Sequence, residues 1–69
     1  MKNFNKTLKE NGLKIVIYIN SKKISKKKAI EMLGESRAAT RFNEALEGYL
    51  QDPFEEQSWM DGMVITFHQ

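Results

Sequence analysis

The segment 13–19 carries the clearest strand pattern in the chain, because β-branched and aromatic residues dominate it. Successive side chains of a strand point to opposite faces, so one face of this strand is entirely aliphatic and the other is only half polar. The two faces carry Leu13, Ile15, Ile17 and Ile19 on one side, and Lys14, Val16 and Tyr18 on the other. Asn20-Ser21 then predicts a tight turn into a short return strand, 22–24.

Two helices are expected after this hairpin. Ser25 is a favourable N-cap for a helix over 26–33, and Gly34 is a natural residue for its end. The inner face of this helix is expected to hold Ala29, Ile30 and Leu33.

The second helix is expected to run from Arg37 to about Gln51, with Ser36 as its N-cap and Asp52-Pro53 as its end. Its apolar residues recur with a period of about 3.6, which indicates a helix packed on a core. This stripe consists of Ala38, Phe42, Ala45, Leu46, Tyr49 and Leu50.

The two ends of the chain add further elements. Phe4 and Leu8 lie four residues apart, which suits a short opening helix, and Asn11-Gly12 suits either its end or a turn between strands. Alternation over 63–67 predicts a last strand. The predicted fold is therefore α+β, a small antiparallel sheet of hairpin plus C-terminal strand packed against two helices, in the order (α)ββααβ.

Sixty-nine residues suffice for one domain, 1–69, whose core is thin, since a chain of this size buries only about 60% of its unfolded surface. No cysteine is present to add a disulfide, so the core must suffice alone or be completed by a partner or a second copy. The longest apolar run, Ile15–Ile19, is too short to cross a bilayer, and the first residues lack a signal-peptide pattern. A cytoplasmic location is expected.

The formal net charge of +2 hides a strong asymmetry along the chain. Residues 1–34 hold nine lysines against Glu10 and Glu31, an excess of seven positive charges. Residues 35–69 hold Arg37 and Arg41 against seven acids, an excess of five negative charges. Neither a uniformly basic nucleic-acid binder nor a uniformly acidic DNA mimic has this distribution.

Two clusters are candidate binding sites. The first is basic and would engage phosphates or an acidic protein surface, although a plain solvated face explains it equally well; its members are Lys22, Lys23, Lys26, Lys27 and Lys28. The second combines aromatic and acidic residues, as protein–protein hot spots do; its members are Tyr49, Phe54, Glu55, Glu56 and Trp59. In so short a chain, Phe54 and Trp59 more often close the core.

Residues 29–40 resemble a helix-turn-helix of the excisionase type, and this resemblance implies that Ser36, Arg37, Thr40 and Arg41 face a DNA major groove. Residues 34–50 also resemble the second helix of ribbon-helix-helix repressors, which implies that strand 13–19 is the DNA-reading ribbon of a dimer.

The segment Tyr18–Lys26 resembles the hairpin opening of small accessory proteins that phages and mobile elements of Gram-positive bacteria encode. These proteins include inhibitors of host defence such as anti-CRISPR proteins. The resemblance implies a context of this kind and an inhibitory or accessory role.

Catalysis has little support, because the single histidine, His68, lies beside the C-terminus and no phosphate-binding loop or metal-ligand spacing occurs. We expect a non-enzymatic binding protein, without cofactor or metal, that docks on a larger protein or nucleoprotein and modulates it. Nucleic acid and a second copy of the chain are further candidate partners. The alternative expectation is a DNA-binding regulator that uses the helix pair.

Overall fold

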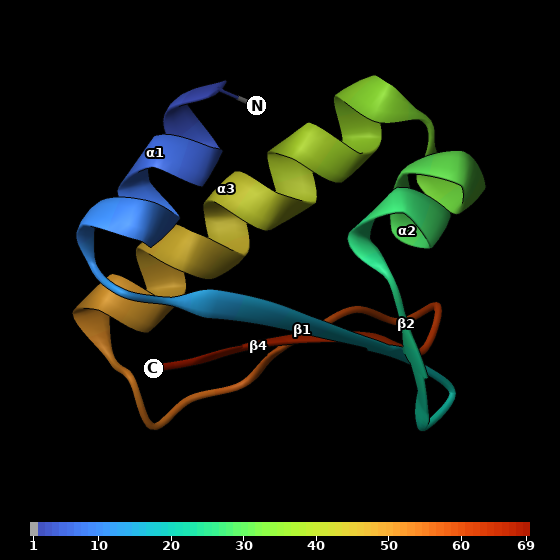
Figure 1. Ribbon diagram of the computed structural model, residues 1–69. Helices are drawn as coiled ribbons and strands as arrows, with labels where there is room; N and C mark the ends of the chain where they lie inside the picture. The colour runs from blue at the N-terminus through green and yellow to red at the C-terminus, as the bar shows by residue number, and fades with distance from the viewer. Residues whose placement is uncertain (1) are drawn as a thin grey trace.

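β1 (Lys14–Ile19) and β4 (Met63–His68) form the centre of a four-stranded antiparallel sheet in the computed structural model, which describes residues 2–69. β2 (Lys22–Ile24) and β3 (Gln57–Ser58) are its edges, in the order β2-β1-β4-β3. The helices α1 (Lys2–Glu10), α2 (Lys26–Leu33) and α3 (Glu35–Gln51) all lie on one side of this sheet (Figure 1). The α+β prediction is confirmed, including its opening helix, and a fourth strand is added.

The hairpin between β1 and β2 turns where the sequence predicts it. Asn20 and Ser21 both have positive φ, 49° and 70°, the combination that matches the twist of two-residue hairpins. Ile17 then pairs with Ile24, and Tyr18 pairs with Lys23. The return strand is therefore confirmed at residues 22–24.

The core lies between the sheet and the helices. The aliphatic face of β1 and the alternate residues of β4 point into it, where the rings of Phe4 and Phe42 stack at 5.6 Å. The buried set is Phe4, Leu8, Leu13, Ile17, Ala29, Ala38, Phe42, Ala45, Leu46, Met63, Ile65 and Phe67. Leu50 does not belong to it and is 51% exposed. At about 100° per residue it lies roughly 90° from the centre of the buried stripe of α3.

Helix α1 ends as a short amphipathic helix should. The N–H of Leu13 donates to the carbonyl of Leu8 at 2.8 Å, and the N–H of Gly12 donates to Lys9 at 3.2 Å. Gly12 has the positive φ, 63°, that this C-terminal motif requires. The opening helix is therefore confirmed, and Asn11-Gly12 does not connect two strands.

The junction of α2 and α3 differs in part from the prediction. Ser25 caps α2 as expected, because its Oγ accepts the N–H of Lys28 at 3.0 Å. Ser36, however, is not a cap, because α3 begins at Glu35, two residues before the predicted start at Arg37, with Gly34 in the cap position and no side chain capping it. Gly34 ends one helix and starts the next, since its N–H donates to Ile30 and its carbonyl accepts from Ala38.

Strand β3 was not expected. Its two residues pair with Ile65 and Val64 of β4 and convert a three-stranded prediction into a four-stranded sheet. A strand of two residues is too short to show an alternating pattern. Among the described residues, no helix is both long and apolar enough to span a membrane.

Candidate binding surfaces

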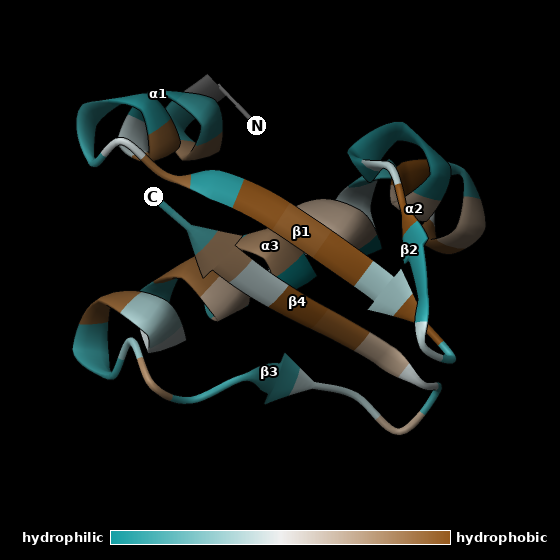
Figure 2. Cartoon of the chain, turned by 60° about the horizontal axis from the view of Figure 1, so that its bottom comes forward, coloured by the Kyte–Doolittle hydropathy of each residue, from teal (hydrophilic) through white to brown (hydrophobic). Residues whose placement is uncertain are grey.

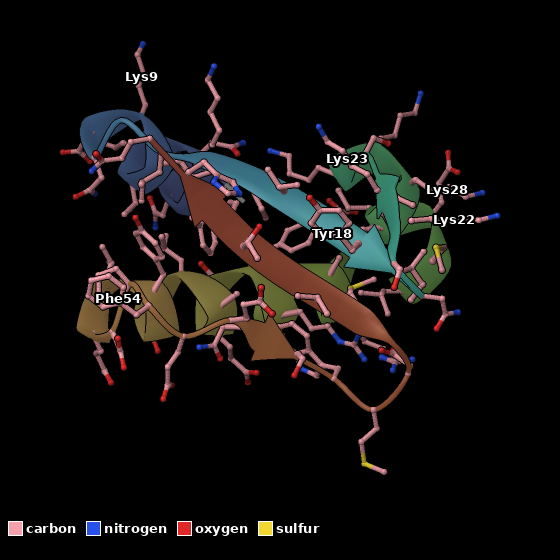
Figure 3. All side chains as sticks on the ribbon, turned by 90° about the horizontal axis from the view of Figure 1, so that it is seen from below. Lys9, Tyr18, Lys22, Lys23, Lys28 and Phe54 are labelled. Carbon is pink, nitrogen blue, oxygen red and sulfur yellow. The ribbon has the colours of Figure 1, made fainter. Side chains whose placement is uncertain are left out.

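The lysine cluster lies where β2 leads into α2. Lys22 and Lys23 occupy the edge strand, and Lys27 and Lys28 occupy the first turn of α2; all four are exposed. Figure 3 shows Lys22, Lys23 and Lys28 at this end of the molecule with their amines in solvent. None of the four forms a salt bridge with a described side chain. These four lysines are called the basic surface below.

Lys26 is separate from the basic surface. Its side chain is half-buried, donates to Oδ1 of Asn5 at 2.7 Å, and lies 5.9 Å from the ring centroid of Phe4. A cation over an aromatic face is stabilising. Lys26 therefore holds α2 against α1.

Arg41 is also engaged within the molecule. Its guanidinium forms a salt bridge with Asp61 at 2.8 Å, donates to the sulfur of Met63 at 3.5 Å, and lies 5.1 Å from the ring centroid of Trp59. The hydrogen bond from Arg41, with a further one from the N–H of Met63, holds the pKa of Asp61 below its usual value. Arg41 joins α3 to the loop between β3 and β4.

Of the residues predicted to face a DNA groove, some are thus exposed and one is bound within the molecule. Arg37 and Thr40 are exposed at the start of α3, in a shallow hollow of about 250 Å³ that Arg41 and Trp59 also line. Arg41 itself is held by Asp61. The ribbon-helix-helix arrangement needs β1 to pair with a second copy, whereas β4 pairs along the whole of β1 and β2 pairs along residues 17–19 of its other edge.

The aromatic and acidic cluster likewise separates into side chains that pack against the core and side chains that are exposed. Tyr49 is half-buried with its ring 5.4 Å from that of Phe67, and Trp59 packs against the core. Phe54, in contrast, is 97% exposed, and its N–H donates to Oδ1 of Asp52 at 3.1 Å. Phe54 and the exposed Glu55 and Glu56 remain together as a surface, called the acidic loop below.

The acidic loop lies just before β3 and thus at the opposite edge of the sheet from β2. A cavity of about 300 Å³ lies beside it, between the end of α3 and β4. Its lining includes Tyr49, Phe54, Glu55, Glu56, Phe67 and His68. The basic surface therefore lies at the β2 edge of the sheet and the acidic loop at the β3 edge, so the charge asymmetry of the sequence is also a separation of charge in space.

One surface was not singled out from the sequence, namely the side of the sheet that no described helix covers (Figure 1). Strand alternation and the observed register assign Lys14, Val16, Tyr18, Lys23, Val64, Thr66 and His68 to it. This bare face is half apolar, and the two central strands are largely hydrophobic along their length (Figure 2). The alternation in 13–19 already separates its β1 residues from the core, but the partners on β2 and β4 depend on the register.

No protein-family model matches the chain, and searches of curated proteins and of solved structures likewise gave no match. The candidate function is therefore argued from the surfaces alone.

Proposed function

We propose that this chain is a small, non-enzymatic binding protein that docks on a larger protein or nucleoprotein and modulates it by occupying a surface. The proposal includes the context that the hairpin resemblance implies, an accessory or inhibitory protein of a phage or mobile element. The observation that carries it is the basic surface, in which Lys22, Lys23, Lys27 and Lys28 stand exposed without an acidic partner among the described side chains.

Uncompensated charge of this kind favours an acidic partner. Like charges gathered on one surface repel one another, and an approaching polyanion relieves that repulsion. Lys26, which the sequence grouped with them, is used inside the fold, and so is Arg41 of the predicted DNA-facing set. The four remaining lysines are accordingly free to form intermolecular contacts.

The acidic loop is the candidate for a second contact. Phe54 is a large apolar side chain that contributes nothing to the core, and exposed aromatics flanked by charge are frequent anchors of protein interfaces. Tyr49 and Trp59, which the sequence grouped with it, are half-buried and contribute to packing. The second contact therefore narrows to Phe54, Glu55 and Glu56.

Affinity capture from the native cell type, with and without nuclease, tests this function. The double variant Lys22→Glu/Lys23→Glu should lose the captured partner. Lys6→Glu/Lys9→Glu is the matched control, because it changes the net charge equally at exposed positions of α1 and should retain the partner. Equal capture by the parent and both variants would contradict a role for the basic surface.

The acidic loop needs its own variant. Phe54→Ser/Glu55→Gln/Glu56→Gln should weaken capture of the same partner while leaving the fold intact, since all three side chains are exposed. Unchanged capture would remove the acidic loop from the proposal and leave the basic surface as the sole contact.

The alternative function, a DNA-binding regulator, is favoured by the exposure of Arg37 and Thr40 at the start of α3. It predicts binding to duplex DNA with a steep loss of affinity as salt rises, because Lys and Arg displace counterions from phosphates. Arg37→Gln should weaken that binding. An interaction insensitive to salt would argue against this alternative.

A further inference from the structure

We propose that the bare face binds single-stranded nucleic acid, with a base stacked on Tyr18 and phosphates contacting Lys14 and Lys23. The inference rests on the proposed docking function, because it names the chemical component of the partner that this side of the molecule meets. Its basis is the register of the sheet, the aromatic ring of Tyr18 on the bare face and the charges around that ring.

The register places Tyr18 at the hairpin end of the bare face, in a row of paired residues that crosses all four strands. Tyr18 lies opposite Lys23 on β2 and opposite Val64 on β4, so a lysine and an aliphatic side chain flank its ring. Directly opposed residues of antiparallel strands have their Cβ atoms about 5 Å apart. The tyrosine is half-buried, which fixes the ring but leaves part of it accessible. A fixed, accessible aromatic ring is the feature that base stacking requires.

A shallow hollow of about 520 Å³ lies beside this ring. Its lining includes the apolar surface of Tyr18 and Val64 and the polar residues Asn20 and Ser21 of the hairpin turn. An unpaired base placed there meets both apolar surface and hydrogen-bonding groups. A duplex offers no unpaired base to such a site, which is why a single strand is the proposed ligand.

The charges around Tyr18 complement phosphate. Lys23 is beside the ring, and Lys14 lies on the same face at the start of β1, whereas Lys22 pairs with Ile19 and points to the other side of the sheet. Figure 3 views the molecule from this side and shows Lys22 and Lys28 farther from Tyr18, at the outer edge of the same end of the sheet. One acid, Glu56, lines the hollow on the β3 side, so the expected path of the phosphates is along the β1 and β2 side.

The far end of β4 completes the face. The hydroxyl of Thr66 donates a hydrogen bond to the carbonyl of Val16 at 3.3 Å, so this donor is already used within the sheet. His68 is exposed opposite Lys14 and offers a second ring near the start of β1. Tyr18 remains the principal stacking site, because it alone is flanked by both the hollow and the basic edge.

Fluorescence anisotropy with labelled oligothymidylate and oligouridylate of about 12 nucleotides tests the inference, and the two probes separate DNA from RNA as the ligand. Tyr18→Leu should weaken binding by ~5-fold or more, the loss expected for one stacked base, whereas Tyr18→Phe should bind as the parent does. Phe54→Leu is the control, since it removes an even more accessible aromatic ring outside the bare face (Figure 3) and should change nothing.

Two further probes separate stacking from charge. An abasic oligonucleotide of the same length carries the phosphates without bases and should bind more weakly than oligothymidylate. Lys23→Gln should lower the slope of log affinity against log salt by about 0.7, the value for one phosphate contact on a single strand, while Lys9→Gln leaves it unchanged. Equal binding of the abasic probe, or a Tyr18→Leu variant that is folded by circular dichroism and binds as the parent, would overturn the inference.

This outcome is distinguishable from failure of the docking function. If Lys22→Glu/Lys23→Glu loses the captured cellular partner while the purified parent binds no oligonucleotide, docking stands and the nucleic-acid inference is overturned. If oligonucleotides bind through Tyr18 but the captured partner is indifferent to Lys22 and Lys23, the inference stands and the docking function fails.

Discussion

The carboxylate of Asp61 lies 2.8 Å from the guanidinium of Arg41, and this pair fixes the loop between β3 and β4 to the middle of α3. The arginine side chain is 13% exposed and the aspartate side chain 43%, so the pair lies at the boundary of the core rather than inside it. Trp59 stacks on the same guanidinium, which gives the arginine three partners when Met63 is included.

Arg41→Gln should therefore destabilise the fold by about 1 kcal/mol, a value that combines a solvent-screened ion pair with a cation–π contact. Urea unfolding measures it. Arg37→Gln is the control, since Arg37 is exposed on the same helix and should change stability by less than about 0.5 kcal/mol. Equal effects of the two variants would show that the Arg41 contacts contribute nothing beyond general charge.

Stability should also depend on the protonation of Asp61. Its pKa is lowered in the folded state, chiefly by the hydrogen bond from Arg41, so the pair is stabilising above the ordinary value of 3.8. That stabilisation is lost as the pH falls below 3.8 and through the lowered folded pKa. Asp61→Asn should thus be less stable than the parent at neutral pH, and the difference should shrink toward zero in acid. A difference independent of pH would contradict this assignment.

Gly62→Ala should be more destabilising than Gly12→Ala. Both glycines have positive φ, 93° and 63°, which disfavours a side chain by about 1–2 kcal/mol. A Cβ at Gly12 meets open space. A Cβ at Gly62, just before β4, collides with Oδ1 of Asn20, just after β1. Thermal unfolding of the two variants measures the difference. Equal melting temperatures would show that Asn20 moves aside without a loss of stability.

Phe54→Ser should leave the free energy of unfolding within about 0.5 kcal/mol of the parent, because the ring is almost entirely exposed. Phe42→Ala is the contrasting variant, since Phe42 is fully buried against Phe4, and its loss should cost about 3–5 kcal/mol. Chemical denaturation of both distinguishes a surface anchor from a core residue. A large loss on replacing Phe54 would assign it to the core.

The secondary structure could be predicted wherever a local pattern is long enough to recur. The alternation of 13–19, the Ser25 cap and the stripe from Ala38 to Tyr49 all appear as expected. The prediction for Leu50 was wrong because a small change in helix phase decides whether a residue beside the apolar stripe is buried. The prediction for Ser36 was wrong because a small shift of the helix boundary decides which residue is the N-cap. β3 was missed because a two-residue strand is defined by its partner in β4 and not by its own sequence.

The candidate surfaces were harder to predict, because the availability of a charged side chain depends on its tertiary neighbours. The ammonium group of Lys26 donates a hydrogen bond to Asn5, which lies 21 residues away in the chain, and the guanidinium of Arg41 forms a salt bridge with Asp61. Neither pairing follows from local spacing. The sequence pattern separated Tyr18 from the aliphatic face of β1, but only the register places Lys23 and Val64 beside it.

The shortness of the two outer strands has a consequence for how this protein meets other molecules. Long, unpaired strand edges invite neighbouring chains to extend the sheet and so lead to polymers. Here β2 offers three residues at one edge, two of them lysine, and β3 offers two residues at the other. Beyond these outer strands, only residues 14–16 of β1 and 66–68 of β4 have no paired strand on their outer side. Each stretch of backbone open to growth in the plane of the sheet is therefore only two or three residues long, which leaves little length for a further strand to add to.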